Sequence, residues 1–149
     1  MTQNQNWIWF SSLNILPIKK IRMLRKFRKI ENIYEASQTE LLKIEDVNFI
    51  DIAEIEKSKN LDLIKKYEDY INKNDIKVIN ISDKYYPEKL KEIYDPPVVL
   101  FAKGNLELLR EKSLAIVGSR DASEYGLKQS HDLAYNLSKN NVVIISRFG

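Results

Sequence analysis

The sequence has no cysteine, one histidine, and only four glycines and four prolines among its 149 residues. Without cysteine there is no disulfide framework, no thiolate nucleophile and no cysteine-bound zinc. One histidine excludes a metal site made of several imidazoles. No apolar run approaches the ~18 residues of a membrane span, and residues 1–10 lack the charged region and cleavage site of a signal peptide. We therefore expect a cytoplasmic protein that binds no metal, cofactor or membrane.

Acidic residues are missing from the amino-terminal end. Residues 1–30 hold seven basic side chains and no acidic one, whereas the rest of the chain holds 17 basic and 21 acidic ones. Helical periodicity from Pro17 onward separates an apolar side from a basic stripe at spacings of three and four. The apolar side consists of Ile21, Met23, Leu24, Phe27 and Ile30, and the basic stripe of Lys19, Arg22, Lys26 and Lys29. The stripe predicts either a solvated helix face or a non-specific contact with a phosphate backbone; a membrane-surface helix is disfavoured because a core needs the apolar side.

Glycine is absent from residues 12–74, and Pro17 is the single proline there. The apolar residues of this stretch recur at helical spacing, which predicts successive helices. Ser37 and Glu40 have the spacing of a capping box and are expected to open one of them. With 44% apolar residues in the chain, a buried core is expected. The sequence therefore predicts a helical module over residues 1–74.

The pattern changes to short β-rich segments after residue 75. Strands are predicted at residues 76–81, 98–102, 114–117 and 142–145, with a helix over residues 123–139. The last two strands are continuous apolar runs, which are typical of parallel strands covered on both faces. Two such strands joined by a helix form the opening of a doubly wound sheet. We therefore expect an α/β protein whose second domain, residues 75–149, is an incomplete Rossmann-like parallel sheet.

The most informative segment follows the third predicted strand. Gly118 permits a tight turn and the close approach of a ligand. Ser119 and Ser123 supply hydroxyl donors, and Arg120 supplies a planar charged fork. The helix that begins there adds free N–H groups. This combination predicts a phosphate site, although it also fits an ordinary turn between strand and helix with Arg120 solvated.

Other notable side chains fit the interior or the surface as well as a site. The tyrosines Tyr85, Tyr86 and Tyr94 could stack on bases or pack around the proline-rich turn at residues 95–97. The aromatic residues Trp7, Trp9 and Phe10 are expected to hold the first helix on the core. His131 has no nucleophile or acid nearby in the sequence and is expected at the surface. The carboxylates are scattered, so no general acid–base pair is predicted.

Three motifs occur in a fixed order between residues 85 and 146. The first comprises Tyr86-Pro87, Ile93 to Pro97, Leu100-Phe101 and Gly104-Asn105; the second runs from Ala115 to Arg120; the third is Ser123, Tyr125 and Gly126. In order and spacing they resemble the DNA-processing protein A family, also called DprA or Smf. The helical half resembles more loosely the family's amino-terminal region, a module of SAM or helix-hairpin-helix type.

The resemblance implies a function as well as a fold. Members of the family are cytoplasmic bacterial proteins with an extended Rossmann-like domain that binds single-stranded DNA, and they are not known as enzymes. They act in natural transformation and recombination, protect the incoming strand, help to load the RecA recombinase and form homodimers. The residues that match the phosphate-contacting surface are Gly118, Ser119, Arg120, Ser123, Tyr125, Gly126 and Ser146.

The sequence departs from the family pattern near both ends. Leu16-Pro17 is followed by no glycine, so a hairpin that grips DNA through backbone amides is not expected there, and the basic stripe would act by charge alone. After the fourth strand the family continues Ser-Gly-Leu-Ala-Arg-Gly-Ile-Asp, whereas this chain has Ser146-Arg147-Phe148-Gly149. Insertion of one nucleotide into the codons for this segment would produce the change. We therefore hypothesise that the chain is the truncated product of a frameshifted gene.

Truncation within the sheet predicts exposed strand edges and apolar faces. The chain is then expected to be marginally stable and its DNA binding impaired. Two alternatives follow from the sequence: a Rossmann-like nucleotide-binding enzyme of the phosphoribohydrolase type, and a non-functional frameshifted remnant.

Overall fold

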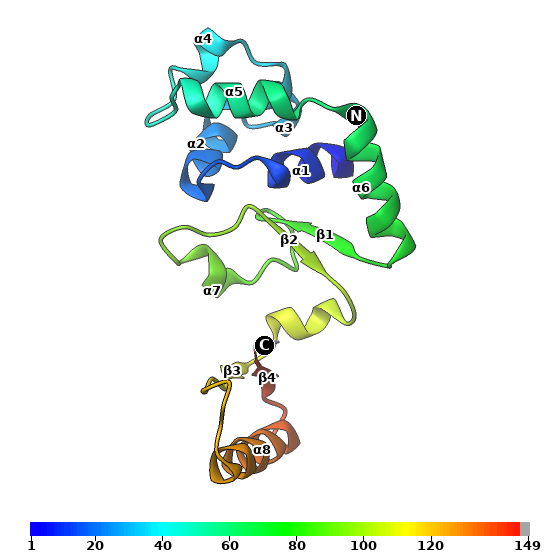
Figure 1. Cartoon of the computed structure of the whole chain (residues 1–149), viewed down its shortest axis with the longest axis vertical. Helices are drawn as coiled ribbons and strands as arrows, with labels where there is room; N and C mark the ends of the chain where they lie inside the picture. The colour runs from blue at the N-terminus through cyan, green and yellow to red at the C-terminus, as the bar shows by residue number, and fades with distance from the viewer. Residues whose placement is uncertain (147–149) are drawn as a thin grey trace. The chain divides into compact units, whose positions relative to one another are not determined.

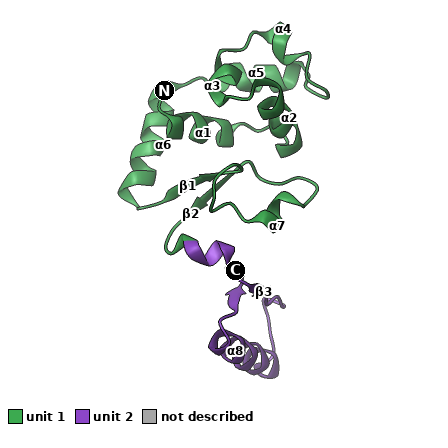
Figure 2. Ribbon diagram, turned by 180° about the vertical axis from the view of Figure 1, so that it is seen from behind, with its two compact units in different colours: residues 1–106 green, residues 107–149 purple. Residues whose placement is uncertain are grey.

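The computed structural model describes residues 1–146 and contains two compact units (Figures 1 and 2). Unit 1 comprises Met1–Leu106, and unit 2 begins at Glu107. The chain is α/β, with an amino-terminal helical part and a short parallel sheet in unit 2. The division follows Leu106 and not residue 74, because the first two strands pack against a helix of unit 1 and share its core.

Unit 1 contains six helices before its first strand. They are α1 (Gln3–Ser12), α2 (Pro17–Phe27), α3 (Ile30–Glu35), α4 (Gln38–Leu41), α5 (Phe49–Ser58) and α6 (Leu61–Lys73). Capping boxes at Thr2, Ser37 and Asn48 open α1, α4 and α5 and satisfy amides that have no partner within the helix. The predicted capping box at Ser37 is therefore confirmed, but the helix it opens is only four residues long.

Helix α1 lies before residue 12, where the helical pattern recognised in the sequence begins. Trp7, Trp9 and Phe10 do not lie in front of the first helix; they are part of it, and all three are buried. The Trp9 ring meets Tyr34 edge-on, with 4.8 Å between the ring centroids, and its Nε1–H donates to Ser58 Oγ at 2.8 Å. The sequence does not reveal this helix for two reasons. Residues 2–6 are polar, and a helix that is buried on most of its surface has little apolar periodicity.

The strands of unit 1 form an antiparallel pair, so the second half of the chain is not one parallel sheet. β1 (Lys77–Asn80) pairs with β2 (Val99–Ala102), with Ile79 opposite Leu100. The connection between them includes the short helix α7 (Glu88–Lys91). Tyr86 is buried in this connection, and its hydroxyl donates to the carbonyl of Pro97 at 2.6 Å. Tyr86 thus packs around the prolines as predicted, whereas Tyr94 is 90% exposed and does not.

Unit 2 is a β–α–β arrangement preceded by the 3-10 helix η1 (Leu106–Arg110). β3 (Ser113–Ala115) and β4 (Val143–Ile145) are parallel, with Leu114 opposite Ile144. Between them lies α8 (Glu124–Lys139), which matches the predicted helix closely. None of residues 107–146 is buried. The expected exposure of the apolar faces is therefore confirmed: Leu114, Val117, Leu127 and Ile145 are exposed.

Candidate functional site

The loop between β3 and α8 borders a cavity of about 850 Å³. Six of the seven residues predicted to contact phosphate line it, namely Gly118, Ser119, Arg120, Ser123, Gly126 and Ser146. Tyr125 is 73% exposed and is not part of the lining. Ser146 follows β4 and belongs to the lining because the two strands are parallel, so both end at the same edge of the sheet.

Gly118 leaves this cavity open. A Cβ added to it would have no atom within 4 Å, and its φ angle is not in the left-handed region. Neither backbone strain nor packing within the described chain therefore requires glycine here. A side chain here would extend into open space, which is consistent with close approach of a ligand.

The amino-terminal end of α8 supplies donors. Ser123 is the N-cap, and its Oγ accepts from the amide of Gly126 at 3.2 Å. The hydroxyl hydrogen of Ser123 remains able to donate outward. A 16-residue helix also carries partial positive charge at this end, where its first amides lack helical partners. Ser119 Oγ likewise accepts from the amide of Asp121 at 3.3 Å, which leaves its own hydrogen to donate.

Two charged side chains of opposite sign lie in the loop. Arg120 is exposed and forms no ion pair within residues 1–146, so its fork is available for phosphate oxygens. Asp121 also lines the cavity, and sequence analysis did not single it out. A carboxylate repels phosphate but accepts hydrogen bonds from amino groups, such as those on nucleobases. The loop thus offers separate partners for a phosphate and for a base.

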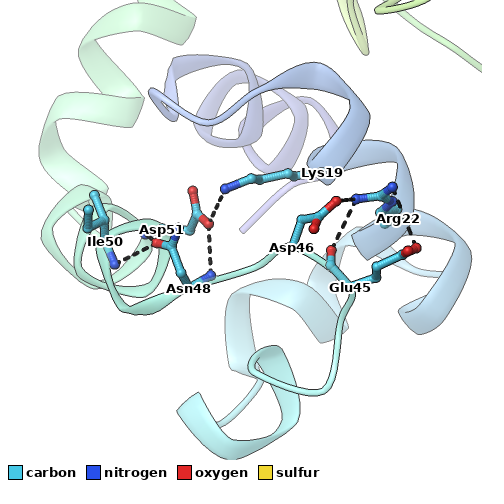
Figure 3. Close-up of polar contacts among 7 residues, drawn as sticks. All are labelled: Lys19, Arg22, Glu45, Asp46, Asn48, Ile50 and Asp51. Carbon is cyan, nitrogen blue, oxygen red and sulfur yellow. Dashed lines mark hydrogen bonds and ion pairs between the residues drawn. The ribbon is translucent and has the colours of Figure 1, made fainter.

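Two of the four residues of the predicted basic stripe on α2, Lys19 and Arg22, form ion pairs within unit 1. Lys19 Nζ lies 2.7 Å from Asp51 Oδ2, and this pair is mostly buried. Arg22 pairs with Glu45 and Asp46 in the segment before α5 (Figure 3). The hydrogen bond to Asp46 raises the pKa of the Arg22 guanidinium above its usual value. Half of the stripe therefore holds α2 to its neighbours, with Lys19 mostly buried and Arg22 partly exposed.

Asp51 connects two of these contacts. Its Oδ2 accepts both from Lys19 Nζ and from the amide of Asn48, at 2.7 and 2.9 Å (Figure 3). The second bond completes the capping box of α5. Only Lys26 and Lys29 of the predicted stripe are exposed and form no ion pair within the described chain. The sequence could not reveal this, because the acidic partners lie more than twenty residues away.

Three further sequence predictions concern metal sites, membrane spans and the position of His131. Residues 1–146 contain no cluster of three or more His, Asp or Glu that could hold a metal. No helix among these residues has the length and apolarity to cross a membrane. The His131 side chain is 80% exposed, as predicted, and its nearest acid is the adjacent Asp132.

Comparisons with known proteins agree on one family. Its sequence profile, DNA recombination-mediator protein A, matches residues 77–148. Protein Smf of Borreliella burgdorferi is 32% identical over 142 residues, which are 95% of this chain and 44% of that protein. DNA processing protein DprA of Streptococcus pneumoniae is 48% identical over 67 residues, and that of Bacillus subtilis 44% over 72 residues.

The shorter matches cover 45% and 48% of this chain and 23% and 24% of those two relatives. The chain therefore spans less than half the length of these relatives. The profile begins at β1 and includes the loop between β3 and α8, where the second and third motifs lie. The position at which the family's Gly-Leu-Ala-Arg-Gly-Ile-Asp segment would begin falls at residues 147–149, outside the described residues. On these matches, the chain belongs to the DprA/Smf family.

Proposed function

We propose that the loop at residues 118–123, together with Ser146, binds the phosphates of single-stranded DNA during recombination. The observation that carries this proposal is the cavity at the end of β3, which is lined by six of the seven residues that the sequence predicts to contact phosphate. An anion there would meet the start of α8, two serine hydroxyls and Arg120. The names of the relatives, DNA processing protein and DNA recombination-mediator protein, support a polynucleotide as the source of that anion.

Binding of this kind requires no bond to be broken. Arg120 holds one phosphate, the amides at the start of α8 hold it or its neighbour, and Asp121 is free for a base amino group. Contacts to backbone phosphates carry no sequence information, so the loop would tolerate any base sequence. In natural transformation such a protein would protect the strand and pass it to RecA, acting as a homodimer in its full-length form and not as an enzyme.

Replacing Arg120 by Ala tests the proposal. Binding of oligo-dT should weaken, and the slope of log K against log salt should fall by about 0.7 for one lost phosphate contact on a single strand. Arg110→Ala is the matched control, because Arg110 is also exposed in unit 2 but does not line the cavity. Equal slopes for Arg120→Ala and the unaltered protein would refute the assignment.

The enzyme alternative makes a different prediction for the same cavity. A phosphoribohydrolase would bind AMP in preference to oligo-dT and release adenine from it. Competition between AMP and labelled oligo-dT therefore separates the two functions. Binding of neither ligand would contradict both and leave the loop as an ordinary strand–helix turn.

A further inference from the structure

A second cavity lies within unit 1, beside the carboxyl-terminal end of α2, and has a volume of about 290 Å³. Its walls combine Trp7 of α1 with three isoleucines and a leucine, and Arg25, Arg28 and Ser82 border it. It is distinct from the loop of unit 2, with which it shares no residue. It also lies at the opposite end of α2 from Leu16-Pro17, where a DNA-gripping hairpin was considered. We call it the arginine pocket.

The two arginines of this pocket differ from the cations at the start of the same helix. Lys19 and Arg22 are neutralised by acids of unit 1, whereas Arg25 and Arg28 form no ion pair or side-chain hydrogen bond within residues 1–146. Cations near a helix carboxyl end are favoured by the helix dipole. That preference explains positive charge at this end, but it does not explain two free guanidinium groups around an apolar cavity.

Trp7 provides a second observation. Its Nε1 is the one buried side-chain nitrogen or oxygen of the described chain that has no hydrogen-bond partner. Such groups are rare because burying an unpaired donor is unfavourable. Trp7 is 9% exposed and contributes to the wall of the arginine pocket. Among the described residues, Trp7 therefore joins an unsatisfied N–H donor to the wall of the arginine pocket, and an oxygen-rich occupant carries hydrogen-bond acceptors.

From these features we infer that the arginine pocket binds one nucleotide unit of a single-stranded nucleic acid, with its phosphate on Arg25 and Arg28 and its base or sugar on the apolar wall. Guanidinium groups pair with phosphate in a bidentate manner and also stack on bases. Lys26 and Lys29 add two positive charges at the same end of α2, so the charge of this surface complements a polyanion. The identity of the polymer, though not the pocket, rests on the function proposed above.

The experiment compares two double variants that lose the same charge. Arg25→Ala with Arg28→Gly removes both arginines of the pocket, and Lys26→Ala with Lys29→Ala is the matched control outside it. Glycine is chosen at position 28 because Arg28 has a φ angle of 61°, a conformation that glycine adopts more readily. Oligo-dT binding is measured by fluorescence anisotropy on the full chain at several salt concentrations.

We expect the arginine variant to bind about tenfold more weakly than the lysine variant at the same salt. Photo-crosslinking with an iodouracil-containing oligonucleotide should label the peptide that contains Trp7, and Arg120→Ala should leave this crosslink in place. Equal affinities of the two double variants would overturn the inference in favour of diffuse charge. Competition by polyglutamate as effective as that by oligo-dT would overturn it in favour of an acidic polypeptide.

Failure of the inference can be told apart from failure of the proposed function. If the unaltered chain binds no oligo-dT, the polymer assigned to both sites is wrong. A different outcome refutes only the arginine pocket. In that outcome the unaltered chain binds oligo-dT and Arg120→Ala weakens binding, but the arginine double variant lowers the affinity no more than its lysine control does. Circular dichroism of both double variants controls for folding.

Discussion

Units 1 and 2 have comparable apolar content in their elements but bury it very differently. In unit 1, Trp9, Phe10, Met23, Ile33, Leu41 and Ile55 are completely inaccessible and belong to one continuous core. In unit 2, no residue from 107 to 146 is buried, and strand residues such as Leu114 and Ile145 are exposed. Regular secondary structure is present in both. In unit 2 a strand, a turn and a capped helix are therefore present although no residue from 107 to 146 is buried.

The comparison also separates two uses of basic residues. In unit 1, Lys19 and Arg22 fix a helix to its neighbours by ion pairs. In unit 2, Arg120 is exposed, lines a cavity and has no such pair in the described chain. Positive charge in the sequence is therefore a poor guide to function until the acids that lie beside it in space are known.

The largest difference in stability between the two units is expected when an aliphatic side chain is removed from each. Ile55→Ala should lower the free energy of unfolding of unit 1 by about 4 kcal/mol, because Ile55 is fully buried and its loss leaves a cavity. Leu133→Ala in α8 should cost less than about 1 kcal/mol, because Leu133 is 49% exposed. Urea unfolding followed by tryptophan fluorescence reports on unit 1, since Trp7 and Trp9 both lie there; hydrogen exchange of α8 reports on unit 2.

Comparable losses for Ile55→Ala and Leu133→Ala would contradict the comparison. Unit 2 would then have a packed interior in solution, formed with a second molecule or by a different arrangement of its elements. Sedimentation at two protein concentrations would distinguish these explanations, since only the first depends on concentration.

The second prediction concerns the ion pair between Lys19 and Asp51. Asp51→Ala leaves Lys19 without its acid and removes the acceptor for the Asn48 amide. We expect unit 1 to lose about 2–3 kcal/mol of stability, because breaking one partner of a largely buried pair leaves an uncompensated charge. Lys77→Ala is the control, because its pair with Asp75 is exposed to solvent and contributes little to stability. An equal effect of both substitutions would show that burial does not strengthen the Lys19 contact.

The sequence predicted correctly those features that depend on residues close together in the chain. Ser123 as the cap of α8, the strand before Gly118 and the cluster of serines with Arg120 all follow from residues within a few positions of one another. Helix α1 and the partners of Lys19 were missed because both depend on distant segments. A buried helix loses its periodicity in the sequence, and no spacing rule connects position 19 with position 51.

Lys20 gives the stability of unit 1 a dependence on pH. It is 5% exposed, and its Nζ donates to the carbonyl of Ser11 at 3.2 Å. Burial lowers its pKa from 10.5 to about 8, with Glu54 opposing the change. Between pH 8 and 10.5 the unfolded chain therefore binds more protons at this side chain than the folded one, so its contribution to stability rises with pH.

The slope from Lys20 cannot exceed about 1.4 kcal/mol per pH unit. Burial raises the pKa of Tyr86, whose contribution falls as pH rises, so the measured quantity is the difference between the unaltered protein and Lys20→Met. This difference, from urea unfolding at pH 7 to 10.5, should shift in favour of the unaltered protein as pH rises. A constant difference would show that Lys20 is solvated in the folded state.

The smallest effect is expected from two glycine substitutions at left-handed positions. Arg28 in unit 1 and Asn141 in unit 2 have φ angles of 61° and 58°. This conformation is unfavourable for arginine, whereas asparagine tolerates it. Arg28→Gly should therefore stabilise unit 1 by about 0.5–1 kcal/mol, and Asn141→Gly should leave the stability of unit 2 unchanged. Arg25→Gly, within α2, should cost about 1 kcal/mol. If Arg28→Gly destabilised the protein as Arg25→Gly does, the Arg28 side chain would be part of the packing of unit 1 and could not be free to contact a ligand.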